Sequence, residues 1–491
     1  MSTHGTGGAG RELQFAVIGA GVAGILAAIQ LRENGYRNIT IWEKAERPGG
    51  TWRENTYPGI CCDVPSHMYR YSFEPNAEWS HRYSPGSEIQ DYVEGVVGKY
   101  ELDAITRYGE EIEELRFEDG RWRLRTKSGL RDEVDVVIAA TGVLHHPNIP
   151  QIEGLESFAG PCFHTARWDH STSWKGKRVG VIGNGSSGVQ VVGAITPEVE
   201  QMLLFQRTAQ WIMAGTNPAY SEEEKESFRR DPALMAEMHR EIGRAFEEGF
   251  GEAVTDPNSP QLQTIASMCL QHLEEGIRDP VLREKLRPTY QAACKRLVIS
   301  PDFYEALQLP NADVITEGIE RIEPSGVRTA DGTLHELDML VLATGFRVDR
   351  FLRPIHVFGR DGADLDQIWK DRPVAYLSIS MPEFPNLFLL NGPNGPVGNF
   401  SLIEVAEMQF RYILQLIEKL REGSAREVEA SRAATEKFEV DRAEQSKNTI
   451  WMTGCRSWYL DDRGIPAVWP WKFSQFRERM QAPEFADYDL R

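Results

Sequence analysis

The chain has few cysteines and no long apolar segment. No run of eighteen apolar residues occurs among its 491 residues, so the sequence predicts no transmembrane helix. The first residues, MSTHGTGGAGREL, lack the apolar core of a signal peptide. Six cysteines are present and no two form a C-x-x-C pair, which argues against a locally encoded zinc site or dithiol centre. We therefore predict a cytoplasmic protein with reduced thiols.

Basic residues are also fewer than acidic ones. The chain has 54 Lys and Arg against 73 Asp and Glu, which gives a net charge of −19. Such a charge argues against nucleic acid or anionic lipid as a partner. The hydrophobic content of 41% is ordinary for a globular protein, and the length suggests about three domains. Neither a monomer nor a homodimer is favoured by the sequence.

A glycine-rich segment near the N-terminus predicts a first dinucleotide site. GAGVAG, from Gly19 to Gly24, follows a short apolar stretch and precedes an amphipathic one, as in a strand–turn–helix unit. Gly19 permits the turn, Gly21 lets a pyrophosphate approach the backbone, and Gly24 lets the helix pack on the strand. The next predicted strand ends at Glu43, where an acid accepts hydrogen bonds from an unphosphorylated ribose. The site therefore suits FAD or NAD rather than NADP.

The residues that follow favour FAD over NAD. RPGGTWRENTYPGICCDVPSHMYRYSF is rich in glycine and aromatic residues, unlike the next strand–helix unit of a plain dehydrogenase. Flavoproteins of the glutathione-reductase type carry a loop here that runs along the FAD. Gly50 offers close backbone approach to a planar flavin, and Trp52 offers an aromatic wall.

A second glycine-rich segment predicts a second nucleotide site of different specificity. GNGSSG, from Gly183 to Gly188, again lies between an apolar stretch and a helical pattern. The strand after it ends in Gln206–Arg207–Thr208 rather than in an acid. An arginine with a neighbouring hydroxyl suits a ribose 2′-phosphate. We therefore predict FAD at the first site and NADP(H) at the second.

The rest of the chain divides around these two sites. Residues 111–142 alternate like a small antiparallel sheet followed by a buried strand, and similar strands end at Thr141–Gly142 and Thr344–Gly345. The acidic, Glu- and Met-rich stretch 216–294 has helical periodicity. We predict an α/β fold with two Rossmann-type dinucleotide-binding domains, for FAD and NADP, and a helical insertion in the NADP domain. The predicted segments are FAD 1–150, NADP 151–215, insertion 216–294, NADP 295–385 and FAD 386–491.

Two further motifs carry a family resemblance that spans almost the whole chain. FAGPCFHTARWD, with the spacing F-x-G-x-x-x-H-x-x-x-W-D, resembles the fingerprint of the type I Baeyer–Villiger monooxygenases. GGTWRENTYPGICCD resembles their second signature, G-G-x-W-x-x-x-x-[FY]-P-G-x-x-x-D, and ends at Asp63. The first motif contributes candidate domain-coupling residues, namely Phe158, Gly160, His164, Trp168 and Asp169. The Trp-Asp ending distinguishes it from the related N- and S-oxygenating enzymes.

The resemblance implies a reaction and its residues. Lys295 and Arg296 are similar to a Lys–Arg pair of that family, in which the lysine helps to hold the NADP phosphate and the arginine reaches the flavin. The implied reaction uses NADPH and O₂ to insert one oxygen atom next to a ketone carbonyl, through a C4a-peroxyflavin. An anionic oxygen donor needs a fixed cation beside it, and Arg296 is the candidate, with Asp63 as its orienting partner.

The candidate catalytic residues are therefore Arg296 and Asp63, and no metal site is predicted. The candidate cofactor-binding residues are Gly19, Gly21, Ala23, Gly24, Glu43, Lys44, Gly50, Thr51, Trp52, Asp63, Tyr69, Ile112, Thr141, Gly183, Gly185, Ser186, Ser187, Gly188, Arg207, Thr208, Lys295, Thr344 and Gly345.

Two other functions stay open at this point. A heteroatom-oxygenating monooxygenase on the same scaffold would turn over sulfides or amines but never ketones. A non-oxygenating NADPH-binding flavoprotein would fail to oxidise NADPH under air. The C-terminal CRSWYLDDRGIPAVWPWKF resembles the family's substrate-lining segment but equally fits a packed edge of the FAD domain. The identity of the small-molecule ketone is not legible in the sequence.

Overall fold

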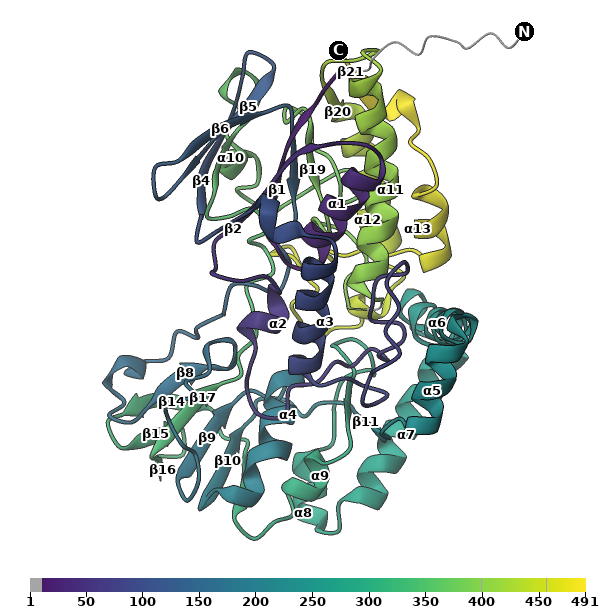
Figure 1. The fold of residues 1–491 in the computed structure, drawn as a ribbon. Coiled ribbons are helices and arrows are strands. Elements are labelled where there is room, and N and C mark those ends of the chain that lie inside the picture. Colours follow the sequence, from purple (N-terminus) through teal and green to yellow (C-terminus); the bar gives the residue numbers. More distant parts are fainter. Residues whose placement is uncertain (1–10, 399, 456) are drawn as a thin grey trace, which may run out of the picture.

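Two parallel sheets form the centres of two α/β units in a computed structural model, which describes residues 11–398, 400–455 and 457–491 (Figure 1). The first sheet has the order β19 (Leu387–Leu389), β7 (Val136–Ala139), β1 (Gln14–Ile18), β2 (Asn38–Glu43), β3 (Thr106–Tyr108). The second has the order β13 (Ala312–Ile315), β10 (Gln201–Phe205), β9 (Arg178–Ile182), β17 (Met339–Leu342), β8 (Cys162–His164). All pairs within both sheets are parallel, which confirms the predicted fold class.

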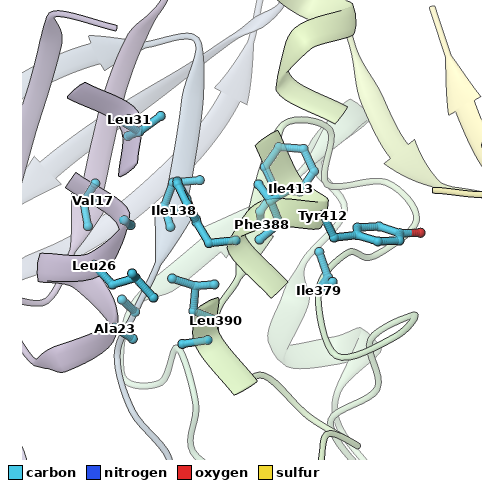
Figure 2. Close-up of a cluster of buried hydrophobic side chains, with 14 of the residues drawn as sticks. Val17, Ala23, Leu26, Leu31, Ile138, Ile379, Phe388, Leu390, Tyr412 and Ile413 are labelled. Atoms are coloured by element: carbon cyan, nitrogen blue, oxygen red, sulfur yellow. The ribbon is translucent and has the colours of Figure 1, made fainter. Parts of the chain in front are cut away.

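Each central strand of the first sheet contributes side chains to two hydrophobic cores, because successive side chains point to opposite faces of the sheet. On one face, Val17, Ile138 and Phe388 pack against helices α1 (Val22–Glu33) and α11 (Leu402–Arg421). Figure 2 shows these side chains in one cluster with Leu26 of α1 and Ile413 of α11. Alternate residues such as Ile18 and Val137 face the other core. Burial on both faces explains why these strands are continuous apolar runs.

An antiparallel sheet covers the second face of the first unit, as the alternation in residues 111–142 predicts. It contains β4 (Ile112–Glu118), β5 (Arg121–Thr126) and β6 (Arg131–Val134). A fourth strand, β18 (His356–Phe358), pairs parallel with β4. Leu352 and Val357 pack in the same core. The stretch 352–385, which the sequence assigned to the NADP segment, therefore packs on the first unit instead.

Helices cover the second unit, and several of them lie within residues 216–294, the stretch predicted as a helical insertion. The insertion contains α5 (Glu222–Arg230), α6 (Pro232–Phe246), α7 (Pro260–Gly276) and α8 (Pro280–Lys285). Ser221 and Glu224 form a capping box at the start of α5, whose acidic first turn and basic last turn complement the helix dipole. The paired strands β11 (Ile212–Ala214) and β12 (Val298–Ser300) flank the insertion.

The remaining elements complete the two units. They are α2 (Thr51–Glu54), α3 (Gly86–Lys99), α10 (Leu365–Ile368), α12 (Arg432–Ser446), α13 (Phe473–Arg479), β20 (Val428–Ala430) and β21 (Tyr488–Leu490) in the first, and α4 (Ser186–Ile195), α9 (Phe303–Ala306), β14 (Ile319–Glu323), β15 (Gly326–Thr329) and β16 (Leu334–Glu336) in the second. None of the helices in the described ranges is long and apolar enough to cross a membrane.

The cysteine pattern differs from the prediction. Cys294 and Cys455 form a disulfide across 161 residues of sequence, so the thiols are not all reduced. The other four cysteines are free. Short Cys spacings do not indicate this pair, because only the fold brings the two residues together.

Candidate active site

The first glycine-rich turn joins β1 to α1 and requires glycine at two positions. Gly19 has φ +103°, and a Cβ there would lie 2.6 Å from the carbonyl oxygen of Ala140. A Cβ on Gly24 would lie 1.8 Å from the carbonyl oxygen of Gly19. Gly21 precedes the first turn of α1, which contains the buried Ala23 and has no side-chain cap. The free amides and positive dipole end of α1 therefore suit an anion such as a pyrophosphate.

Glu43 lies beside this turn, as its position at the end of β2 predicts. Its carboxylate accepts hydrogen bonds from the backbone N–H of Ala20 at 2.8 Å and of Ala45 at 2.9 Å. Arg53 lies 3.2 Å from the same carboxylate. These contacts fix a buried carboxylate at the edge of the nucleotide site. For the adjacent Lys44, burial lowers the pKa of the ammonium group, against the charge of nearby acids.

The loop after β2 packs directly on the first turn. Gly50 has φ +55°, and a Cβ there would lie 3.1 Å from Cα of Gly21. Trp52, in the short helix that begins at Thr51, donates from Nε1 to the Tyr69 hydroxyl at 3.2 Å. The ring of Trp52 meets that of Tyr69 edge-on at 5.5 Å between centroids. The loop thus presents a bare backbone and two fixed aromatic rings.

Polar atoms near the start of α11 also suit a polar ligand. Asn391 Oδ1, Ser401 Oγ and Gln409 Nε2 are buried and have no hydrogen-bond partner within the described part of the chain. Buried polar groups are rarely left unpaired in a native protein. Together with the glycine cradle, these atoms fit a bound flavin nucleotide, which offers phosphates to the helix and a polar ring edge to such groups.

The second glycine-rich turn repeats the geometry of the first between β9 and α4. Gly183 has φ +105°, and a Cβ there would lie 2.4 Å from the carbonyl oxygen of Ala343. A Cβ on Gly188 would lie 2.1 Å from the carbonyl oxygen of Gly183. At Gly185, which precedes Ser186 at the start of α4, an added Cβ would meet nothing within 4 Å. The uncapped start of α4 is thus open to a phosphate group.

Two cations close enough to influence each other have no carboxylate partner in the part of the chain that the structure describes. Neither Arg207 nor Lys295 has an ion-pair partner among residues 11–398, 400–455 and 457–491. Burial lowers the pKa of Lys295, and the like charge of Arg207 lowers it further. The carbonyl of Thr208 accepts a hydrogen bond from Asn184 Nδ2 at 2.9 Å, which ties the end of β10 to the glycine turn. Two unneutralised cations at this place fit a 2′-phosphate.

Asp63 and Arg296 form an ion pair between the two units. Asp63 Oδ2 lies 2.6 Å from Nη2 of Arg296 and accepts a hydrogen bond from its Nε at 3.0 Å. Arg296 Nη1 donates to the carbonyl oxygen of Gly398. Burial lowers the pKa of Arg296, but Asp63 and neighbouring groups outweigh it and raise the pKa above its ordinary value. Arg296 is thus a permanent, oriented cation that remains 27% exposed.

The segment carrying Asp63 is fastened to α4 of the second unit. Ser187 Oγ donates to the Tyr57 hydroxyl at 3.1 Å, and that hydroxyl donates to Gln190 Oε1 at 2.9 Å. A Cβ on Gly59 would lie 2.6 Å from the carbonyl oxygen of Gln190. This contact places the two predicted cofactor sites next to each other.

His164 makes only structural hydrogen bonds in the described chain. Its Nε2 donates to the carbonyl oxygen of Gly345 at 2.9 Å, and its Nδ1 accepts from Ala166 N–H at 3.1 Å. Thr344 Oγ1 donates to the Asn148 carbonyl, so the segments crossing between the units are joined at the same place. The histidine thus fits a coupling role rather than proton transfer.

The other residues of the same motif hold the segment in place. A Cβ on Gly160 would lie 2.5 Å from the carbonyl oxygen of Asp338. Phe158 and Trp168 are buried in cores of the second unit. The Asp169 carboxylate accepts hydrogen bonds from the residues two and three positions further along the chain. The domain-coupling role of these residues stays a prediction.

Two predicted cofactor residues make other contacts. The side chain of Ile112 is buried in the core beneath the antiparallel sheet, so it packs the fold. Thr141 Oγ1 donates to the carbonyl oxygen of Phe351. Their roles in cofactor binding stay predictions.

Sequence reasoning missed two residues beside Arg296. Gly398 carries the carbonyl that binds Arg296, and the hydroxyl of Tyr459 lies against that glycine. The Gly- and Pro-rich pattern of 391–398 signals an unusual backbone at Gly398. No sequence signal marks Tyr459, because its contact with Gly398 joins residues 61 positions apart in the sequence. No group of His, Cys, Asp or Glu in the described residues could hold a metal ion.

Two dinucleotide-type turns, with an Asp–Arg pair between the two units that carry them, are the arrangement expected of a two-cofactor oxidoreductase. The flavin-binding monooxygenase-like family matches residues 12–223. An uncharacterised monooxygenase of Mycobacterium tuberculosis is 44% identical over 482 residues, 98% of this chain and 97% of the relative. A Baeyer–Villiger monooxygenase of Streptomyces coelicolor is 37% identical over 485 residues, 98% of this chain and 93% of the relative.

A solved structure agrees with these relatives. Cyclohexanone monooxygenase from Rhodococcus sp. Phi1, bound to NADP⁺, superimposes with a TM-score of 0.87 at 29% identity, covering 98% of this chain and 99% of the other. This chain belongs to the Baeyer–Villiger monooxygenases, within the flavin-dependent monooxygenases.

Proposed function

We propose that the protein is an FAD-dependent monooxygenase that uses NADPH and O₂ to insert one oxygen atom beside a ketone carbonyl, giving an ester or lactone. The observation that carries this proposal is the Asp63–Arg296 pair, a permanent cation held between two dinucleotide-type sites. FAD, when bound, accepts hydride from NADPH and activates O₂ for transfer to the ketone.

The first unit supplies the residues that would hold FAD. The start of α1 after Gly21 would face the pyrophosphate, Glu43 would bind the ribose, and the loop at Gly50 and Trp52 would lie along the flavin. The second unit would hold NADP(H) at the start of α4, with Arg207 and Lys295 on the 2′-phosphate.

The chemistry asked of the protein itself is electrostatic. Oxygen transfer to a carbonyl develops negative charge, and a preorganised cation stabilises it without reorganisation. Arg296 is such a cation, and Asp63 fixes its direction through two nitrogen atoms. Because Asp63 comes from the first unit and Arg296 from the second, the ion pair can form only when the two units are correctly placed against each other.

We further propose that the partners are a small-molecule ketone and O₂ and that the protein acts in the cytoplasm, where NADPH is available. The net charge of −19 supports the exclusion of nucleic acid as a partner.

Oxygen-isotope labelling tests the proposed function. The purified flavoprotein would be supplied with NADPH and ¹⁸O₂ and, separately, with cyclic, linear and aryl ketones and with an organic sulfide. We expect an ester or lactone carrying one ¹⁸O atom, with NADPH consumed in equal amount. Arg296→Ala should still be reduced by NADPH yet form at least about 100-fold less ester, because it lacks the fixed cation. Labelled sulfoxide without any ester, or NADPH oxidation that yields only peroxide, would overturn the proposal.

A further inference from the structure

The C-terminal segment reaches the centre of the candidate active site at Tyr459. This tyrosine is 2% exposed, and its hydroxyl lies so close to Gly398 that a Cβ there would be 2.2 Å away. Gly398 has φ +90° and gives its carbonyl oxygen to Nη1 of Arg296. Gly398 therefore lies against the Tyr459 hydroxyl and also binds Arg296, at a different nitrogen from the one closest to Asp63.

The ring of Tyr459 is rigidly held in this place. It packs on Trp458 at 4.0 Å and on Trp451 at 5.4 Å between ring centroids. Its carbonyl accepts a hydrogen bond from Ala467 N–H at 2.7 Å. The Cys294–Cys455 disulfide ties the same segment to the chain two residues before Arg296. A phenol fixed at both its ring and its backbone has little freedom to leave Gly398.

The positive charge of Arg296 influences the pKa of the Tyr459 hydroxyl. Burial raises the pKa of Tyr459, and the guanidinium acts against that rise both through its charge and as a hydrogen-bond donor. The phenol is therefore neutral at ordinary pH, and its oxygen is free to accept from the cation. A neutral acceptor orients a guanidinium without cancelling its charge, which a second carboxylate would do.

We propose that Tyr459 is a positioning residue for oxygen transfer, whose hydroxyl holds the Arg296 guanidinium in register with Asp63 and Gly398. The C-terminal segment would then complete the active site through this contact, in addition to any role in lining the substrate pocket. This inference rests on the proposed function, because it assigns to Tyr459 an action through the cation that the reaction needs.

Replacement of the hydroxyl alone tests the proposal. In Tyr459→Phe we expect NADPH to reduce the flavin at a rate within about twofold of the parent, since hydride transfer does not use this contact. Ester formed per NADPH should fall on the order of 10-fold, the worth of one hydrogen bond to a charged group, with peroxide making up the difference. Tyr412→Phe is the matched control, because its buried hydroxyl pairs with Tyr488 at 3.0 Å, in the C-terminal core of the first unit.

A double-substitution cycle separates positioning from general stability. If Tyr459 acts through Arg296, adding Tyr459→Phe to Arg296→Lys should cost much less than it costs in the parent. Equal ester yield for Tyr459→Phe and the parent, or fully additive losses in the cycle, would overturn the inference. A parent enzyme that forms no ester from any ketone would instead overturn the proposed function. A fall in flavin reduction as large as the fall in ester yield would assign Tyr459 a merely structural role and would also overturn the inference.

Discussion

Arg207 and Lys295 illustrate how single residues set the choice of reductant. The two residues flank the helical insertion in sequence, yet the charge of Arg207 lowers the pKa of Lys295. Among the described residues, no carboxylate forms an ion pair with either of them. Two like charges close together repel each other, and this repulsion is relieved when a ligand supplies a negative charge. At the end of β10, the ligand group that would do so is the 2′-phosphate that distinguishes NADPH from NADH.

Arg207→Ala should therefore weaken NADPH selectively. We expect the KM for NADPH to rise roughly 10-fold, the worth of one charge-assisted contact, while the KM for NADH changes by less than about threefold. Steady-state oxidation of each nucleotide measures both values. Arg230→Ala, which alters an exposed arginine at the end of α5, serves as the control for net charge. Equal losses with both nucleotides would remove the 2′-phosphate from the role given to Arg207.

At the scale of elements, the features with a local cause could be predicted from sequence. Both glycine turns are visible because Gly19 and Gly183 need a positive φ and because Gly24 and Gly188 leave no room for a Cβ. The pairing of β18 with β4 and the contact between Tyr459 and Gly398 could not be predicted. These contacts depend on packing between segments far apart in sequence, and no single-residue preference encodes them.

The Cys294–Cys455 bond is the long-range contact that is simplest to test. Alkylation of the denatured protein without reductant, followed by mass spectrometry, should label the four free cysteines, and all six should be labelled after reduction. In Cys455→Ser the remaining partner loses its bond, so five labels are expected without reductant. Six labels on the unreduced parent would show that the thiols are separate in the isolated protein, as the sequence predicts.

At the scale of the whole molecule, the helical insertion is docked on the first unit around a buried histidine. His67 is fully buried, and neither of its ring nitrogens has a hydrogen-bond partner in the described chain. Its ring meets Tyr220 and Phe228 of the insertion edge-on, at 5.2 and 4.6 Å between centroids. His239 Nδ1 of α6 lies 3.1 Å from the His67 carbonyl oxygen, so both segments of this contact carry a titratable group.

This contact should make the fold sensitive to acid. Burial lowers the pKa of His67 from 6.5 to about 4, with Arg70 and His239 acting in the same direction. The folded state thus binds fewer protons than the unfolded state between these values, and stability is lost as the pH falls through that window. The loss from this one group is about 2 kcal/mol between pH 7.5 and pH 5, at 1.36 kcal/mol per unit.

In His67→Leu the side chain cannot titrate, so that part of the acid sensitivity should disappear. Urea unfolding at pH 7.5 and pH 5 would show a smaller difference in unfolding free energy for the variant than for the parent, by about 2 kcal/mol. His356→Gln, at an exposed position on β18, should leave the parent's difference unchanged. If His67→Leu and the parent lose equal stability over this range, the histidine is protonated in the folded protein and the insertion is not docked around a neutral ring.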